Sequence, residues 1–207
     1  LMRVHHYIKN ILIFMPLIFS GNLTDRRKFT ATLLGMIAFS LVTSAVYIIN
    51  DIRDAEKDRM HPTKKNRPIA SGAVTPFHAV ELMVFILIAA VVLLVVSDAT
   101  AGSYALVILY LFINVAYSMG LKDVPLLDVT ILASGFLLRV LFGAVLTGTE
   151  VSEWLYLTVL SGAFYFSLGK RRNELQKKKD GDTRKVLKYY TRDFLDKNMY
   201  MCLALLN

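Results

Sequence analysis

The chain has 207 residues and a formal net charge of +8, yet 55% of its residues are hydrophobic and its mean hydropathy is +0.49. This apolar content excludes a disordered chain, and a basic nucleic-acid-binding domain would explain the charge but not the hydrophobicity. The single cysteine, Cys202, excludes an intramolecular disulfide and a thiolate metal cluster. A membrane protein with its basic residues gathered in loops accounts for both properties. We therefore expect membrane lipids, and no nucleic acid, as partners.

Apolar segments recur along the chain at lengths that suit membrane helices, which need about 20 mainly apolar residues. In chain order, the predicted spans are 7–19, 29–49, 79–96, 99–121, 126–146 and 154–168. Residues 199–206 resemble the start of a further span. The sequence thus predicts an all-α polytopic transmembrane helix bundle of about six helices and the start of a seventh. We expect residues 1–207 to form one membrane domain that lacks its C-terminal part.

The Lys and Arg residues are unevenly divided between the two sides of this topology. Alternating the spans places 20 of the 24 on one side, in segments 1–10, 50–78, 118–125 and 169–197. The positive-inside rule predicts that this side is cytoplasmic. The long loops, which have room for chemistry, therefore face the cytoplasm.

An acidic stripe follows the second predicted span. Asp51, Asp54 and Asp58 are spaced i, i+3 and i+7, so on a continuing helix they project within about 60° of one another. Carboxylates so placed repel one another unless a cation lies among them. Magnesium prefers oxygen ligands and commonly combines one or two carboxylates with substrate phosphates; Asn50 can add a neutral oxygen. The alternative is a solvated acidic helix end.

A basic loop, residues 61–68, comes directly after the stripe and contains Lys64 and Arg67. Lys and Arg bind the phosphate oxygens that a metal leaves free, so stripe and loop together predict a magnesium–diphosphate site. Membrane topology alone would also place basic residues here.

Further polar residues lie at or within the later spans. Tyr117 and Lys122 occupy a cytoplasmic turn, where Lys122 suits a phosphate; an interface tyrosine and a topology-determining lysine are the alternatives. An ionisable residue within a span usually faces the protein interior and is a functional candidate. We expect Asp128 to be a further carboxylate beside magnesium. Arg139 lies about 16 Å deeper along the helix and either reaches a lipid phosphate or forms a structural ion pair.

The sixth predicted span ends in Lys170, Arg171 and Glu174, where Lys170 and Glu174 have the i, i+4 spacing of an ordinary surface pair. Residues 177–197 are expected to contact headgroups or water. Lys9 stands at the cytoplasmic start of the first span. The four histidines have no consistent metal-ligand spacing, and we expect none to bind a metal.

Several motifs resemble the UbiA superfamily of intramembrane prenyltransferases. NDIRDAEKD followed by HPTKKNRPIASG is similar to its first signature, and RVHHYIKNILIFMPLIFSG, YSMGLKDVPLLDV, SGFLLRVLFGAV and SLGKRRNEL are similar to its decaprenyl-phosphate phosphoribosyltransferase branch. The resemblance implies nine spans around a central cavity, with the signature at its cytoplasmic mouth. Ordinary members carry a second pair of acids four residues apart. Here the nearest acids, Asp123 and Asp128, are five apart and separated by Pro125, which favours the phosphoribosyl branch.

The resemblance implies a magnesium-dependent transfer of 5-phosphoribose from 5-phosphoribose 1-diphosphate to a polyprenyl phosphate, for cell-wall biosynthesis at a bacterial plasma membrane. The expected catalytic and magnesium-binding carboxylates are Asp51, Asp54, Asp58 and Asp128, with Asn50 as a further metal ligand. The expected substrate-binding residues are Lys9, Asn50, Lys64, Arg67, Tyr117, Lys122, Arg139, Lys170, Arg171 and Glu174. An aromatic prenyltransferase that uses a prenyl diphosphate is the alternative. A transporter is disfavoured because its acids would lie nearer the midplane. A homo-oligomer is left open.

Overall fold

The structure, a computed structural model, describes residues 1–176 and 185–206 and confirms the all-α bundle. The α-helices are α1 (Met15–Phe19), α2 (Arg26–Arg53), α3 (Ala55–Arg59), α4 (Pro76–Val96), α5 (Ala101–Met119), α6 (Leu127–Thr147), α7 (Glu153–Gln176) and α8 (Arg192–Ala204). The 3₁₀ segments are η1 (Val4–Phe14), η2 (Asn22–Thr24), η3 (Lys64–Asn66), η4 (Leu121–Asp123) and η5 (Lys185–Tyr189).

Four of the described helices, α2, α4, α5 and α6, are long and apolar enough to cross a membrane, and Val4–Phe19 forms a shorter apolar helix. α7, which covers the predicted span 154–168, is not among these four helices. The bounds of the four differ from the predicted spans by a few residues, and a polar cap sets the start of some of them. For example, α4 begins at Pro76 because proline suits the first helical position and the Thr75 hydroxyl accepts the His78 N–H at 3.2 Å.

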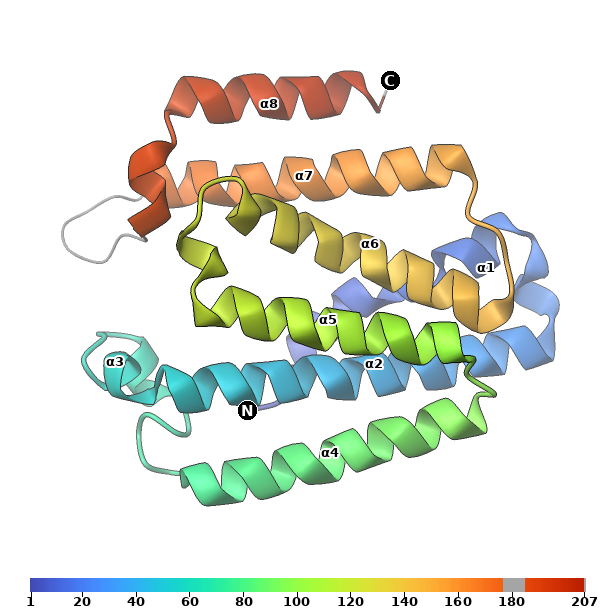
Figure 1. Cartoon of the computed structure of the whole chain (residues 1–207), viewed down its shortest axis with the longest axis horizontal. Coiled ribbons are helices and arrows are strands. Elements are labelled where there is room, and N and C mark those ends of the chain that lie inside the picture. Colours follow the sequence, from blue (N-terminus) through green and yellow to red (C-terminus); the bar gives the residue numbers. More distant parts are fainter. Residues whose placement is uncertain (177–184, 207) are drawn as a thin grey trace.

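The last helix differs from the prediction. It begins at Arg192 and not near Met199, because the Thr191 hydroxyl accepts the Phe194 N–H at 3.1 Å and Asp193 lies in the first turn, where an acid is favourable. Its buried Leu195 and Cys202 pack with Leu168 of α7. Thus α8 lies along α7 (Figure 1), and Cys202 is buried in the apolar contact between them.

The bundle has two chemically different ends, which position the candidate site. One end collects the C-terminus of α2, α3, the α5–α6 turn and the C-terminus of α7 (Figure 1). The other end collects the N-terminus of α2, the α4–α5 turn and the C-terminus of α6. Between them, Phe39, Tyr110 and Phe142 form the centre of the apolar core.

The segment η1 packs unusually close to α6. A Cβ added to Gly143 would lie 1.9 Å from the Ile13 carbonyl oxygen, so only glycine fits there. The buried Asn10 side chain donates to the Ser40 hydroxyl of α2 at 2.8 Å. These contacts hold the N-terminal segment between α2 and α6.

Candidate functional site at one end of the bundle

The acidic stripe lies where α2 ends and α3 begins. The Asp54 N–H donates to the Asn50 carbonyl at 2.9 Å and the Asp58 N–H to the Asp54 carbonyl at 2.8 Å, although α2 itself ends at Arg53 and Asp54 has the non-helical angles φ −89° and ψ 2°. Asp51 and Asp58 are buried and Asp54 is half-buried, while Glu56 is exposed. The stripe therefore faces the protein.

Two arginines from other segments meet this stripe. Arg67 of the basic loop lies between Asp51, at 3.3 Å, and Asp58, at 2.6 Å. Arg3 donates to Asp51 at 2.5 Å, and its guanidinium lies 4.7 Å from the centre of the Tyr47 ring. Sequence reasoning predicted Arg67 but missed Arg3, since 48 residues separate Arg3 from Asp51 and no local spacing connects them.

A second cluster is centred on Asp128, which is fully buried together with Arg171. The Arg171 guanidinium donates to Asp128, to Glu174 at 2.7 Å and to the Tyr117 hydroxyl at 3.0 Å. Four of the predicted site residues thus form one network, contributed by α5, α6 and α7. In this arrangement the Asp128 carboxylate is neutralised by an arginine.

Tyr190 completes this second cluster and was missed by sequence reasoning. Its hydroxyl donates to Asp128 and accepts the Leu126 N–H at 2.8 Å. Leu126 has a φ of +67°, a strained value for a bulky residue. Burial, followed by the hydrogen bond to Asp128, raises the pKa of Tyr190 to about 12, so the hydroxyl keeps its proton at neutral pH. Tyr190 therefore anchors both the carboxylate and the strained turn before α6.

The two clusters are neighbours, because the Ser118 hydroxyl donates to the Asn50 side-chain oxygen. Asn50 precedes the acidic stripe and Ser118 follows Tyr117. However, within residues 1–176 and 185–206, no three His, Cys, Asp or Glu side chains lie close enough together to hold a metal. Asp128 is thus near the stripe without joining it, and its role beside magnesium stays a prediction.

Arg139 lies deeper in the bundle and is 7% exposed. It donates to the Asn10 side-chain oxygen at 2.7 Å, to the Tyr110 hydroxyl at 3.2 Å and to the Gly135 carbonyl. Its guanidinium also lies 5.3 Å from the centre of the Phe39 ring. All these partners are neutral, and no carboxylate of the described residues pairs with Arg139. The structural ion pair that the sequence left open is absent from the described part.

Four lysines were predicted to bind substrate. Within the described ranges Lys9, Lys64 and Lys122 form no ion pair, whereas Lys170 makes further contacts. Lys64 is in η3, Lys122 in η4 and Lys170 near the end of α7. Lys9 on η1 lies 5.8 Å from the centre of the Phe136 ring.

The segment expected to contact headgroups or water is only partly described. Its lysine run, 177–179, falls outside the described residues. Farther along, Lys197 pairs with Asp193 at 2.8 Å on the exposed face of α8.

The oxygen donors of Asn50, Asp51, Asp54 and Asp58 have the chemistry that magnesium prefers. Asp54 has no ion pair in the described part of the chain, whereas Arg67 bridges the other two carboxylates. Among the described residues no three acids converge. The oxygen donors present fit a magnesium ion that takes substrate phosphates as its remaining ligands, which is its usual mode in phosphate-handling sites.

Comparisons with known proteins show the family to which the chain is similar. Residues 11–186 match the profile described as the UbiA prenyltransferase family. The chain is 36% identical over 200 residues to the decaprenyl-phosphate phosphoribosyltransferase of Mycolicibacterium smegmatis, covering 93% of this chain and 62% of that protein. It is 30% identical over 183 residues to the nodulation protein NoeC of Azorhizobium caulinodans, covering 86% and 58%. The chain therefore spans about 60% of the length of these curated relatives.

The fold is similar to that of a solved structure, a UbiA homologue from Archaeoglobus fulgidus bound to DMAPP and Mg²⁺. The TM-score is 0.79 and the identity 18%, with 100% of this chain and 73% of that chain covered. At this identity the likeness concerns the fold.

Proposed function

The chain belongs to the UbiA prenyltransferase family of intramembrane transferases, and we propose that it transfers the 5-phosphoribosyl group of 5-phosphoribose 1-diphosphate to a polyprenyl phosphate, with release of diphosphate. Support for this substrate pair comes from the relatives named decaprenyl-phosphate phosphoribosyltransferase, which are 30% to 36% identical over about 93% of the chain. In this proposal the active end faces the cytoplasm, which the distribution of basic residues supports, and the membrane is a bacterial plasma membrane, which the bacterial relatives support.

The observation that carries the proposal is the interleaving of the acidic stripe with two arginines. Arg67 lies between Asp51 and Asp58, and Arg3 contacts Asp51 from the other side. Carboxylates recruit a metal and arginines bind phosphate oxygens, so this set can hold a metal-bound diphosphate. Arg3 and Arg67 pair with the acids, and a bound diphosphate would compete with the acids for these two arginines.

The second cluster supports a sugar phosphate, and not a prenyl diphosphate, as the donor substrate. Here a single carboxylate, Asp128, is already neutralised by Arg171. The remaining groups at this turn, Tyr117 and Lys122, are a hydroxyl and a cation. They are suited to ribose and phosphate oxygens.

The lipid phosphate is assigned to the cations nearer the membrane interior. Arg139 has only neutral partners in the described residues, and Lys9 lies on the neighbouring η1. A buried charge without a countercharge is costly, so an anionic headgroup between these two residues would be stabilised. The polyprenyl tail then extends into the membrane.

The chemistry is a displacement at the anomeric carbon of the ribose. An oxygen of the lipid phosphate forms a bond to this carbon as the bond to diphosphate breaks, and the electron pair leaves with the diphosphate. Magnesium, when bound, neutralises the charge of the leaving group. Arg3 and Arg67 bind its oxygens as charge develops. No general base is needed, because a phosphate is already ionised at neutral pH.

An aromatic prenyltransferase with a prenyl diphosphate donor is the second candidate, favoured by the fold match to a UbiA homologue bound to DMAPP. Both candidates use a diphosphate at the acidic stripe, but they differ in the group that is transferred.

The test incubates the purified protein with magnesium, decaprenyl phosphate and 5-phosphoribose 1-diphosphate labelled in the ribose. We expect label in the lipid fraction and release of one diphosphate for each labelled lipid. A parallel reaction supplies geranyl diphosphate and 4-hydroxybenzoate. Prenylation of the aromatic acid, with no labelled lipid, would refute the proposal in favour of the second candidate.

A further inference from the structure

Three basic residues lie on the side of the membrane where topology disfavours them. Arg26, Arg27 and Lys28 open α2, at the end opposite the candidate site. From Lys28 to Asp51 the helix rises about 35 Å, slightly more than the hydrocarbon core of about 30 Å. The two ends of α2 therefore reach opposite membrane surfaces, and the cluster lies at the level of the lipid headgroups.

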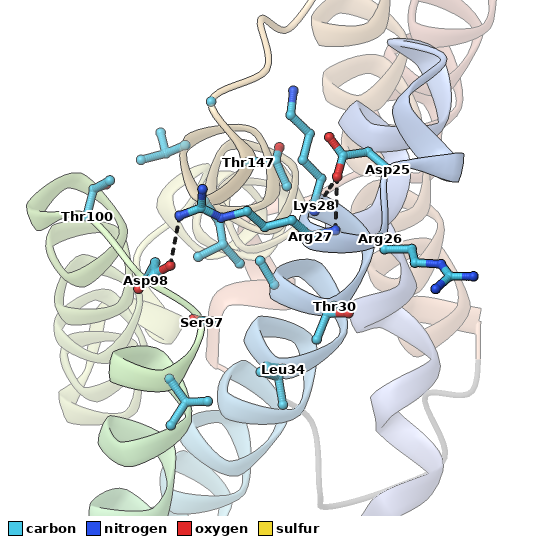
Figure 2. Close-up of a pocket in the computed structure, with 15 residues that line it drawn as sticks. Asp25, Arg26, Arg27, Lys28, Thr30, Leu34, Ser97, Asp98, Thr100 and Thr147 are labelled. Atoms are coloured by element: carbon cyan, nitrogen blue, oxygen red, sulfur yellow. Dashed lines mark hydrogen bonds and ion pairs between the residues drawn. The ribbon is translucent and has the colours of Figure 1, made fainter.

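These residues surround a hollow of about 790 Å³. It is formed by the first turns of α2, the α4–α5 turn and the end of α6 (Figure 2). Its apolar lining is contributed by Ala31, Leu34, Val96, Val145 and Leu146. Its polar rim includes the hydroxyl-bearing Thr100 and Thr147 beside the cations. The rim also contains the acids Asp25 and Asp98, so its three basic residues leave an excess of positive charge. A positively charged rim above an apolar floor has the same polarity gradient as an anionic phospholipid at a membrane surface.

The charges of the rim are only weakly committed to one another. Arg27 reaches across to Asp98 at 3.1 Å, but both side chains are exposed, at 85% and 76%, and such pairs contribute little. The Asp25 carboxylate caps α2 by accepting the N–H groups of Arg27 and Lys28 at 2.9 and 3.2 Å. The helix N-terminus is thus already satisfied, and the available positive charge comes from side chains.

Lys28 and Arg26 differ in their partners and direction. Within the described ranges Lys28 has no ion pair, and its side chain rises beside Asp25 (Figure 2), whereas Arg26 points away from Arg27 and Asp98. Lys28 can therefore bind a ligand without breaking an ion pair. Arg27 can bind the same ligand by giving up its ion pair with Asp98.

We propose that this hollow binds the phosphate headgroup of an anionic phospholipid in the leaflet opposite the candidate site. Lys28 and Arg27 contact the phosphate, Thr147 lies beside the glycerol region, and the apolar floor takes the first part of an acyl chain. The site is separate from the transferase site, so it stands or falls independently of the proposed reaction.

The test titrates the protein in neutral detergent with dioctanoyl phosphatidylglycerol, dioctanoyl phosphatidylcholine or glycerol phosphate, and reads binding by native mass spectrometry. We expect the anionic lipid to bind at least about fivefold more tightly than the zwitterionic one, since a basic side chain that contacts the headgroup contributes about that factor. Equal binding of both lipids would overturn the proposal, and glycerol phosphate binding as tightly as the lipid would identify a soluble phosphate as the ligand.

Three variants test whether the lipid binds in the hollow. An anion bound at the candidate site would bind equally to all three, so a difference between them reports on the hollow. Lys28→Gln should lower phosphatidylglycerol affinity about fivefold, and Asp98→Asn should raise it by freeing Arg27. The matched control, Arg26→Gln, removes the same charge two residues away, from a side chain that points away from Arg27 and Asp98 (Figure 2), and should change the affinity less than twofold. Equal losses in Lys28→Gln and Arg26→Gln, or a loss in Asp98→Asn, would contradict the assignment.

Discussion

At the scale of single residues, the candidate site is built from ion pairs that a charged substrate can exchange. Arg67 connects two acids of the stripe, whereas Asp54 between them has no ion pair in the part of the chain that is described. Asp128, by contrast, is fully buried with Arg171, and breaking such a pair leaves an uncompensated charge at a cost of about 3–5 kcal/mol. A substitution at Asp54 should therefore change catalysis without destabilising the fold.

We predict that Asp54→Asn lowers turnover at least about 100-fold, the usual loss when one group that stabilises developing charge is removed. The thermal unfolding midpoint should change little, because Asp54 is half-buried and unpaired in the described residues. The matched control is Glu56→Gln, an acid of the same segment that is exposed on the other face. Turnover and unfolding would be measured on the same preparations. Wild-type turnover in Asp54→Asn would refute the metal role of the stripe.

At the scale of elements, the site depends on how closely the N-terminal segment approaches α6. Gly143 permits this approach, because it leaves room for the Ile13 carbonyl. The same packing brings Asn10 to Arg139 and places Lys9 near Phe136. Backbone proximity at one glycine thus positions the residues assigned to the lipid phosphate.

We predict that Gly143→Ala destabilises the protein by about 2 kcal/mol or more, because its Cβ would overlap a backbone oxygen that cannot rotate away. Gly162→Ala in α7 is the control: a Cβ there meets nothing within 4 Å. Because alanine favours a helix over glycine by about 1 kcal/mol, this variant should be unchanged or slightly more stable. Thermal unfolding in detergent measures both, and equal midpoints would show that η1 is not so close to α6.

At the scale of the whole molecule, charge and site geometry select the same end of the bundle. The acids of the stripe, the basic loop and the network around Asp128 all lie where α2, α5 and α7 end. This is also the end that the positive-inside rule assigns to the cytoplasm. The predicted orientation therefore agrees with a cytoplasmic source of the proposed sugar diphosphate.

We predict that, in a Cys202→Ala background, a cysteine at Lys65 is labelled by a membrane-impermeant maleimide only after the cells are opened. A cysteine at Glu150 should be labelled in intact cells. Both positions are exposed and lie in loops at opposite ends of the bundle, so each serves as the control for the other. The reverse pattern would place the candidate site outside the cytoplasm.

Much of the fold and part of the site could be predicted from local sequence. Apolar runs of spanning length indicated α2, α4, α5 and α6, and the i, i+3, i+7 spacing placed Asp51, Asp54 and Asp58 on one face, because helical periodicity is a property of neighbouring residues. The predicted start of the last helix was wrong, because the N-cap of α8 is Thr191, which precedes the apolar run.

The partners of the site residues were decided only by the tertiary structure. Arg3 meets Asp51 across 48 residues and Tyr190 meets Asp128 across 62, and no local spacing records such contacts. A net charge of +8 on a largely hydrophobic chain was enough to indicate a membrane protein, and the positions of Lys and Arg between the apolar runs predicted its basic side. Only packing showed which arginines neutralise carboxylates and that Arg139 has neutral partners alone among the described residues, because charge pairing depends on distances between helices that sequence order does not contain.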